Sequence, residues 1–282
     1  MTVITLTPRA DVAAAEAPLT PEQLVGVGER EVARMPLRVG NRAVELGELF
    51  GVGVQVGPVG ASASAGAATP ELRVEAGGPR LHGLGTGMSS GRLVVEGDAG
   101  NRLGAGMSGG EIVVRGSCGD HAGAEMTGGR IRIEGDVGDR AGGAYPGGPK
   151  GMTGGVVLVH GRAGAEAGAA MRRGLIVIGG ACGDRVALHA IAGTVVVFGD
   201  AGETPGLANK RGSVILHGAG ATPPSYRFAC VYEPPYVRVL LRHLVSALAF
   251  PLPERVRGGC YARWVGDFTE LGKGEILRWQ AS

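Results

Sequence analysis

The sequence lacks the features that mark several large classes of protein. Its 282 residues include only four cysteines (Cys118, Cys182, Cys230 and Cys260), too few and too scattered for a disulfide framework. No run approaches 18 consecutive apolar residues, which argues against a membrane span. The N-terminus lacks the basic-then-apolar order of a secretory signal. A net charge of +2 gives no basic excess for binding nucleic acid. We therefore expect a cytoplasmic protein.

Aromatic residues are also scarce, at 4%, whereas glycine accounts for 54 residues. So much glycine is typical of a flexible chain, of collagen or of an internal repeat, and glycine at every third position, as in collagen, is absent. A repeat of 19 residues is present. Its eight coils begin at Thr69, Met88, Met107, Met126, Met152, Met171, Ala190 and Asn209, and the register slips only at a seven-residue insertion, 145–151.

The positions within a coil, numbered here as slots from 1 at Met88, have distinct roles. Glycine recurs in slots 4, 10 and 13, which predicts corners where φ is positive or where the next coil passes too closely for a Cβ. Slots 6 and 8 are apolar, so the residues between the first two corners form a strand with one face in the core. Slot 7 should face outward, yet it is apolar in six coils, and we expect partner subunits to bury it, with the apolar face of residues 236–250 as the intramolecular rival. This outward column is Val94, Val113, Leu158, Val177, Val196 and Ile215, interrupted by Arg132.

Three further columns have a chemical and a structural interpretation. Slot 1 holds five of the seven methionines, and an unbranched side chain that fills an inward corner is favoured over a thioether metal site. Cys118 and Cys182 share the small slot 12 and lie three coils apart, about 14 Å, which excludes a disulfide. Slots 14 and 15 pair acidic residues with neighbours that are often basic. This pattern favours a charge-balanced turn ladder over the carboxylate cluster of a glycan-cleaving enzyme.

The two ends of the repeat have a different composition and are expected to cap it. Thr20, Pro21 and Glu22 form a helix-start pattern, and residues 58–68 are expected to form a loop. Residues 236–250 carry apolar side chains at helical spacing. The predicted fold is all-β: a right-handed parallel β-helix of 19-residue coils with a short N-terminal cap and a C-terminal cap that is α-helical and extended. The expected boundaries are 1–68, 69–221 and 222–282.

The coils GAGMSGGEIVVRG (104–116) and GAEMTGGRIRIEGDVGDRAGG (123–143) resemble a glycine-rich β-helix found in two families. One is the C-terminal domain of the large glutamate synthase subunit, and the other is the C-type subunit of formylmethanofuran dehydrogenase. The flanks VELGELFGV, YVRVLLRHL and YARWVGDFTELGKGEI are similar to this C-type subunit. The resemblance therefore extends over nearly the whole chain.

This resemblance implies a non-catalytic scaffold inside a multi-subunit enzyme of one-carbon metabolism. In methanogens the complex uses a tungsten or molybdenum pterin and iron–sulfur clusters on other subunits. In methylotrophic bacteria a formyltransferase/hydrolase complex transfers a formyl group to a methanofuran-type carrier and hydrolyses it to formate. The composition, with 25 arginines against three lysines, favours the bacterial version. A glutamate-synthase-like domain and a β-helical polysaccharide lyase or hydrolase are the alternatives, and the latter needs a secretion signal and a carboxylate groove.

No catalytic or metal-binding residues are predicted, and this chain is expected to bind no cofactor of its own. Its partners are expected to be the other subunits, not nucleic acid or membrane. The resemblance implies that the carrier has an acidic polyglutamate tail, for which basic residues are candidate partners. Arg172 and Arg173 occupy slots 2 and 3, and Lys210 and Arg211 occupy the same slots two coils later, roughly 10 Å away. A solvated edge or a contact with another subunit is the competing interpretation.

Overall fold

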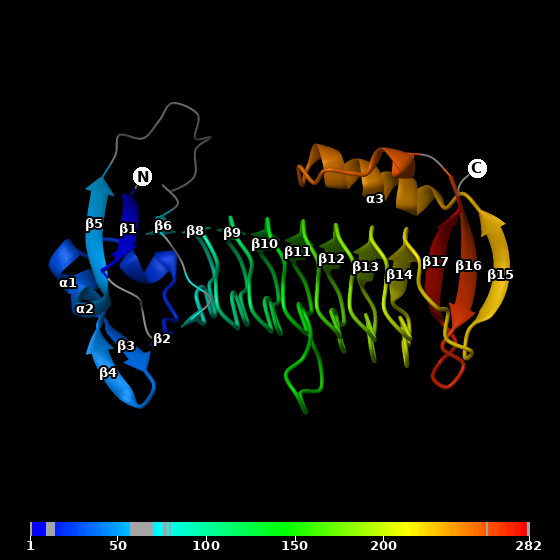
Figure 1. Ribbon diagram of the computed structural model, residues 1–282, viewed down its shortest axis with the longest axis horizontal. Coiled ribbons are helices and arrows are strands. Elements are labelled where there is room, and N and C mark those ends of the chain that lie inside the picture. The colour runs from blue at the N-terminus through cyan, green and yellow to red at the C-terminus, as the bar shows by residue number, and fades with distance from the viewer. Residues whose placement is uncertain are drawn as a thin grey trace.

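The computed structural model describes residues 2–9, 15–56, 70–75, 78, 80–257 and 259–280. The loop expected at 58–68 lies outside these residues. The chain is mostly β, as predicted, and thirteen of the described strands form one large, mostly parallel sheet. Figure 1 shows its central strands in a row, with a small N-terminal lobe at one end and a helix and further strands at the other.

The repeat forms the centre of this sheet. Seven of its strands occupy slots 5 to 8 or 9, as predicted: β8 (Arg92–Glu96), β9 (Glu111–Val114), β10 (Arg130–Ile133), β11 (Val156–Val159), β12 (Leu175–Ile178), β13 (Thr194–Val197) and β14 (Ser213–Leu216). In the first coil, β6 (Glu71–Glu75) pairs with β8 at an offset of 21 residues, Glu71 with Arg92, so the register predicted from Thr69 is wrong by two residues there. From β8 onward each residue pairs in parallel with its counterpart 19 positions later, or 26 positions later across the insertion. Slot 12 adds a second line of isolated parallel bridges, from Ala99 to Ala201.

The interior of the coils is built from slots 1, 6, 8 and 12. All five slot 1 methionines are at most 1% exposed, which confirms that they fill an inward corner. The methyl carbon of each lies about 2.5–2.6 Å from the place where a Cβ would sit on the slot 4 glycine of the next coil, for instance Met107 Cε at Gly129. The methionine and glycine columns are therefore two halves of one packing arrangement.

The N-terminal lobe closes one end of the repeat. Strand β1 (Thr2–Pro8) pairs in parallel with β6 and antiparallel with β5 (Phe50–Val56). A second sheet joins β2 (Ala15–Glu16), β3 (Pro36–Val39), β4 (Arg42–Glu45) and β7 (Leu81–His82), with the short helices α1 (Glu29–Ala33) and α2 (Leu46–Leu49) beside these strands in sequence. The helix start predicted at Pro21 is only a single 3₁₀ turn, Pro21–Leu24, and Thr20 makes no capping bond. Glu22 instead accepts hydrogen bonds from the backbone and hydroxyl of Ser89.

At the other end, the sheet continues beyond the last coil. Strand β17 (Gly274–Gln280) pairs in parallel with β14, and β16 (Cys260–Gly266) and β15 (Arg227–Tyr232) follow antiparallel. Helix α3 spans Pro235–Ser246, close to the predicted range, and a 3₁₀ turn, Glu254–Arg257, precedes β16.

Helix α3 covers the second half of the outward slot 7 column. Leu158, Val177, Val196 and Ile215 are fully buried in one cluster with Val237 and Leu244 of the helix and with Leu248 after it. The hypothesis that partner subunits bury this stripe is therefore wrong for this half of it. The apolar face of the chain's own helix α3 packs on this half of the column, so each apolar surface buries the other.

The methionine–glycine packing predicts that Gly129→Ala destabilises the fold. Gly129 has φ +82°, and a Cβ there would lie 2.5 Å from Met107 Cε and 3.0 Å from the Gly109 carbonyl. We expect a loss of ~3 kcal/mol in unfolding free energy, measured by chemical denaturation. The matched control is Gly106→Ala, since Gly106 has φ +67° but no atom within 4 Å of a Cβ. It should cost ~1 kcal/mol, and equal losses would show that backbone strain alone matters.

The packing of helix α3 on the slot 7 column predicts that Val196→Asp destabilises the isolated chain. Val196 is fully buried in the apolar cluster under the helix, so a carboxylate there would be removed from water among apolar side chains. The thermal unfolding midpoint should fall with a loss of at least ~3 kcal/mol. The control is Val239→Asp. Because Val239 of α3 is 66% exposed, this variant should leave the midpoint unchanged. A stable Val196→Asp chain would mean that the helix does not bury the column.

Candidate functional site

The four basic residues predicted as a binding surface lie on one corner column, just before β12 and β14. Arg172 and Arg173 are exposed, and so is Arg211. Lys210 is half-buried, and its Nζ lies 3.8 Å from Glu270 Oε2 of the loop between β16 and β17. The structure thus places all four on the same corner but partly neutralises Lys210. Arg172, Arg173 and Arg211 form the more available group of positive charges.

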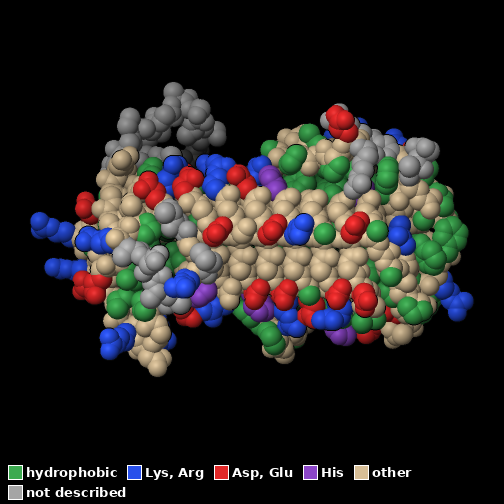
Figure 2. Space-filling view, in the orientation of Figure 1, with side chains coloured by type: hydrophobic (Ala, Val, Ile, Leu, Met, Phe, Trp, Pro, Cys, Tyr) green, Lys and Arg blue, Asp and Glu red, His purple; other side chains and the backbone are tan. Residues whose placement is uncertain are grey.

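The carboxylates of the turns have a structural task. In slot 14, the Oδ1 atoms of Asn101, Asp120, Asp139 and Asp184 each accept a hydrogen bond from the backbone N–H of slot 14 in the next coil, at 2.7–3.0 Å. In slot 11, Oδ1 of Asp98, Asp136 and Asp200 and Oγ of Ser117 likewise accept from the backbone N–H of the next coil. The two rows of side chains run along the visible face in Figure 2. Because they tie one coil to the next, these oxygens stabilise the stack.

Glu166 is an exception in slot 15, where the five other coils between residues 88 and 208 carry basic or polar residues: Arg102, His121, Arg140, Arg185 and Thr204. It is 9% exposed, and its Oε2 lies 2.6 Å from Arg140 Nη2 while its Oε1 accepts hydrogen bonds from Arg185. Burial raises the pKa of this carboxyl, but the hydrogen bonds and charges of Arg185 and Arg140 outweigh burial and hold the pKa below its usual value. Glu166 is therefore ionised at neutral pH and is not a proton donor. The acid in a mostly basic column was the signal for this site in the sequence.

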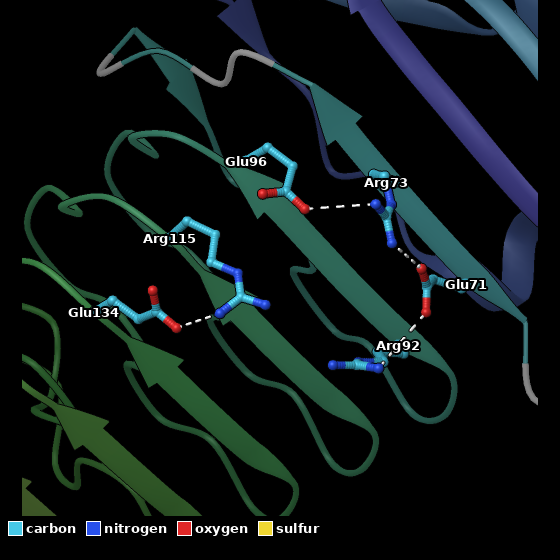
Figure 3. A network of polar contacts seen from close by, with 6 residues as sticks. All are labelled: Glu71, Arg73, Arg92, Glu96, Arg115 and Glu134. Carbon is cyan, nitrogen blue, oxygen red and sulfur yellow. Dashed lines mark hydrogen bonds and ion pairs between the residues drawn. The ribbon is translucent and has the colours of Figure 1, made fainter. Parts of the chain in front are cut away.

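The first half of the outer face, over β6 to β10, is covered by ion pairs rather than by a helix. Figure 3 shows Arg73 between Glu71 and Glu96, at 3.0 and 3.6 Å, and Arg115 beside Glu134. Arg92 joins Glu71 and Glu111, which also contacts Arg130. Such exposed pairs contribute little each. Val94 and Val113 in this half are only 3% and 4% exposed, and the apolar stems of long charged side chains can cover such residues.

The buried cysteines are poor nucleophiles and poor metal ligands. Burial raises the pKa of both Cys118 and Cys182 to about 12, so each remains a thiol at neutral pH. Among the described residues there is no group of three or more His, Cys, Asp or Glu side chains arranged to hold a metal ion. No helix in the described ranges is long and apolar enough to cross a membrane.

The seven-residue insertion forms one wall of a shallow hollow of about 300 Å³. Tyr145 contributes to the lining, and its ring centroid lies 5.1 Å from that of His121, with the two rings tilted by 38°. Arg140, Glu166 and His189 are among the other lining residues. The carboxylate of Glu166, which lines the hollow, is paired with Arg140 and Arg185. The geometry of the described residues thus offers binding surfaces and structural ladders.

The ladders predict a test that separates a structural from a catalytic carboxylate. Asp120→Ala removes the acceptor of the Asp139 N–H, a 2.8 Å bond, and should lower the unfolding free energy by ~1 kcal/mol. Asp120→Asn keeps an acceptor oxygen and should be close to wild type in chemical denaturation. If the asparagine variant is as unstable as the alanine variant, the charge and not the hydrogen bond is what stabilises the turn.

Comparison with known proteins identifies the family. No family model matches this sequence, and no curated protein matches it. A solved structure does match: a chain of the formyltransferase/hydrolase complex (FhcABCD) from Methylorubrum extorquens, crystallised in complex with methylofuran. The two are 36% identical, with a TM-score of 0.84 over 97% of this chain and 98% of that chain. The resemblance predicted from the coils and flanks is confirmed, and the chain belongs to the family of formyltransferase/hydrolase complex subunits.

Proposed function

We propose that this chain is the C-type subunit of a cytoplasmic formyltransferase/hydrolase complex that acts in one-carbon metabolism with a methanofuran-type carrier. The observation that carries the proposal is the end-to-end match, at 36% identity, to one chain of such a complex. A match that includes both ends distinguishes the chain from an isolated repeat domain shared by unrelated enzymes. The flanks VELGELFGV, YVRVLLRHL and YARWVGDFTELGKGEI are the segments that resemble the C-type subunit.

Within the complex the chain acts as a non-catalytic scaffold. We infer that residues 69–221 form a right-handed parallel β-helix between caps at 1–68 and 222–282. Four lines of contact between successive coils support this inference: the parallel strands of slots 5–8, the parallel bridges of slot 12 and the side-chain ladders of slots 11 and 14. Such a stack is held by many repeated contacts. It is therefore suited to present surfaces at fixed spacing.

The turn carboxylates, Glu166 and the buried cysteines are all engaged in the fold. The turn carboxylates accept backbone hydrogen bonds, Glu166 is ionised between two arginines, and the buried cysteines are protonated. These contacts support a subunit that positions other chains and leaves transfer and hydrolysis of the formyl group to them.

The acidic tail of the carrier is proposed to contact Arg172, Arg173, Lys210 and Arg211. Carboxylates would find charge-assisted hydrogen bonds at the exposed guanidinium groups of the three arginines and at the half-buried ammonium group of Lys210. Arg172→Glu with Arg173→Glu should raise the KM of the assembled complex for a polyglutamylated carrier about tenfold and leave kcat unchanged. Arg162→Glu, an exposed arginine in slot 11, is the control. An unchanged KM in the double variant would refute contact with the tail.

Co-purification tests the proposal as a whole. Affinity-tagged chain expressed in its native cell should recover the other members of the complex, identified by mass spectrometry. The chain purified alone should neither transfer nor hydrolyse formyl groups on the carrier. Recovery of a tungsten or molybdenum pterin subunit would assign the chain to a dehydrogenase instead. Turnover by the lone chain that a single substitution abolishes would contradict the scaffold function.

A further inference from the structure

Aromatic residues are concentrated at one end of the molecule. Nine of the twelve in the sequence lie between residues 226 and 279. Exposed large hydrophobic side chains follow the same distribution. Of the eight among the described residues, seven lie between 228 and 271, and Val25 is the exception. Hydrophobic side chains also gather in Figure 2 at the end that carries β15. A protein that is short of aromatics therefore exposes several of them on its C-terminal cap.

Three of these side chains define what we call the end patch: Phe228, Val231 and Phe268, which are 54%, 48% and 54% exposed. Phe228 pairs across the strands with Trp264, and Val231 pairs with Ala262, so both lie on the same face of β15–β16. The rings of Phe228 and Trp264 pack edge to face at 5.7 Å. Phe268 belongs to the loop after β16, and its N–H donates to the Ser225 carbonyl just before β15. The guanidinium of Arg227 lies 5.7 Å from the Phe268 ring and joins the two parts.

This surface has the composition of a protein interface rather than of a solvated cap. Interface centres are enriched in aromatic residues and arginine, and capping segments of repeats normally present a polar outer face. The backbone adds a constraint on the mode of contact. Strand β15 is an edge strand of the sheet and has a register shift between Phe228 and Cys230. Because such bulges disfavour the addition of another strand, the contact must be made by side chains.

The charges around the end patch distinguish between occupants. Arg227 and Lys273 are exposed cations. The acids that flank β15 or lie between the start of the β16–β17 loop and β17 are already engaged. Glu233 pairs with Arg238, Asp267 accepts from the Ala208 N–H, Glu270 lies near Lys210, and Glu275 accepts from Arg263. Two copies of this chain meeting through the patch would bring these cations together. A surface that is apolar at its centre and acidic at its rim is the complementary occupant.

We propose that the end patch docks a different subunit of the complex through such an apolar, acid-rimmed surface. This inference rests on the proposed function, because it requires that the chain is part of a hetero-oligomer. It adds which end of the chain holds the partner and by what chemistry.

The experiment compares exposed positions within the co-expressed complex. Phe228→Asp and Phe268→Asp should each weaken binding of the chain to the other subunits about tenfold or more. Binding is measured by titrating the labelled chain against the remaining subunits, and assembly by size exclusion with light scattering. Val25→Asp is the matched control, since Val25 is 58% exposed in the N-terminal lobe. It should bind like wild type. The melting midpoint of each free variant should match wild type, because none of the three side chains is buried.

Arg227→Glu provides a second measurement that does not depend on removing an aromatic ring. Reversing this exposed charge should weaken binding and reduce its dependence on salt, because it opposes an acidic rim. Normal assembly of all three patch variants would overturn the inference while leaving the proposed function intact. A free wild-type chain that is dimeric, and that Phe228→Asp makes monomeric, would also overturn it in favour of a second copy. If the wild-type chain itself recovers no other subunits, the proposed function fails first.

Discussion

The close approach of each slot 1 methionine to the slot 4 glycine of the next coil is the constraint on which the stack depends. The methyl group takes the space of a Cβ, so any larger residue in slot 4 would push the two coils apart. An unbranched, flexible side chain suits this position because it can follow a narrow path between two backbones. Once this contact fixes how one coil lies on the next, the strands, the slot 12 bridges and the carboxylate ladders all fall into the same register. The column ends at Asn209, whose amide bonds to the backbone of Gly212 instead.

Much of the repeat could be predicted from the sequence, because its contacts repeat at one fixed interval. The strands, the inward methionines and the small slot 12 all follow from the 19-residue period. The period could not predict that helix α3 buries Val177 and Val196, because periodicity shows that a face is apolar but not which segment lies on it. Nor could the pairing of β14 with β17, whose residues lie about 60 positions later and outside the repeat. These are non-local contacts of segments that occur once.

The predicted binding column shows the same division. Slot numbering placed Arg172, Arg173, Lys210 and Arg211 on one corner, and the structure agrees. The slot numbering did not indicate that Glu270, from a loop outside the repeat, lies close to Lys210. The ion pairs of the outer face could be predicted in principle, because slots 5 and 9 alternate in sign over the three coils that begin at Met88, Met107 and Met126. Their role as the cover of Val94 and Val113 emerges only when the limit of helix α3 is known: Arg132 donates to the Ala249 carbonyl at the border between the two halves.

The ladders have a consequence for the length of the molecule. Asp136 accepts from the Arg162 N–H across 26 residues, just as Asp98 accepts from the Ser117 N–H across 19. The intervening insertion thus leaves the hydrogen bond unchanged, whereas a whole added or deleted coil would move everything beyond it by one strand spacing. The stack therefore works as a ruler graduated in steps of about 4.8 Å, and the six steps from β8 to β14 measure roughly 29 Å. The distance between the two ends of the stack is therefore set by the number of coils. It can change only by whole coils, each adding or removing one strand spacing.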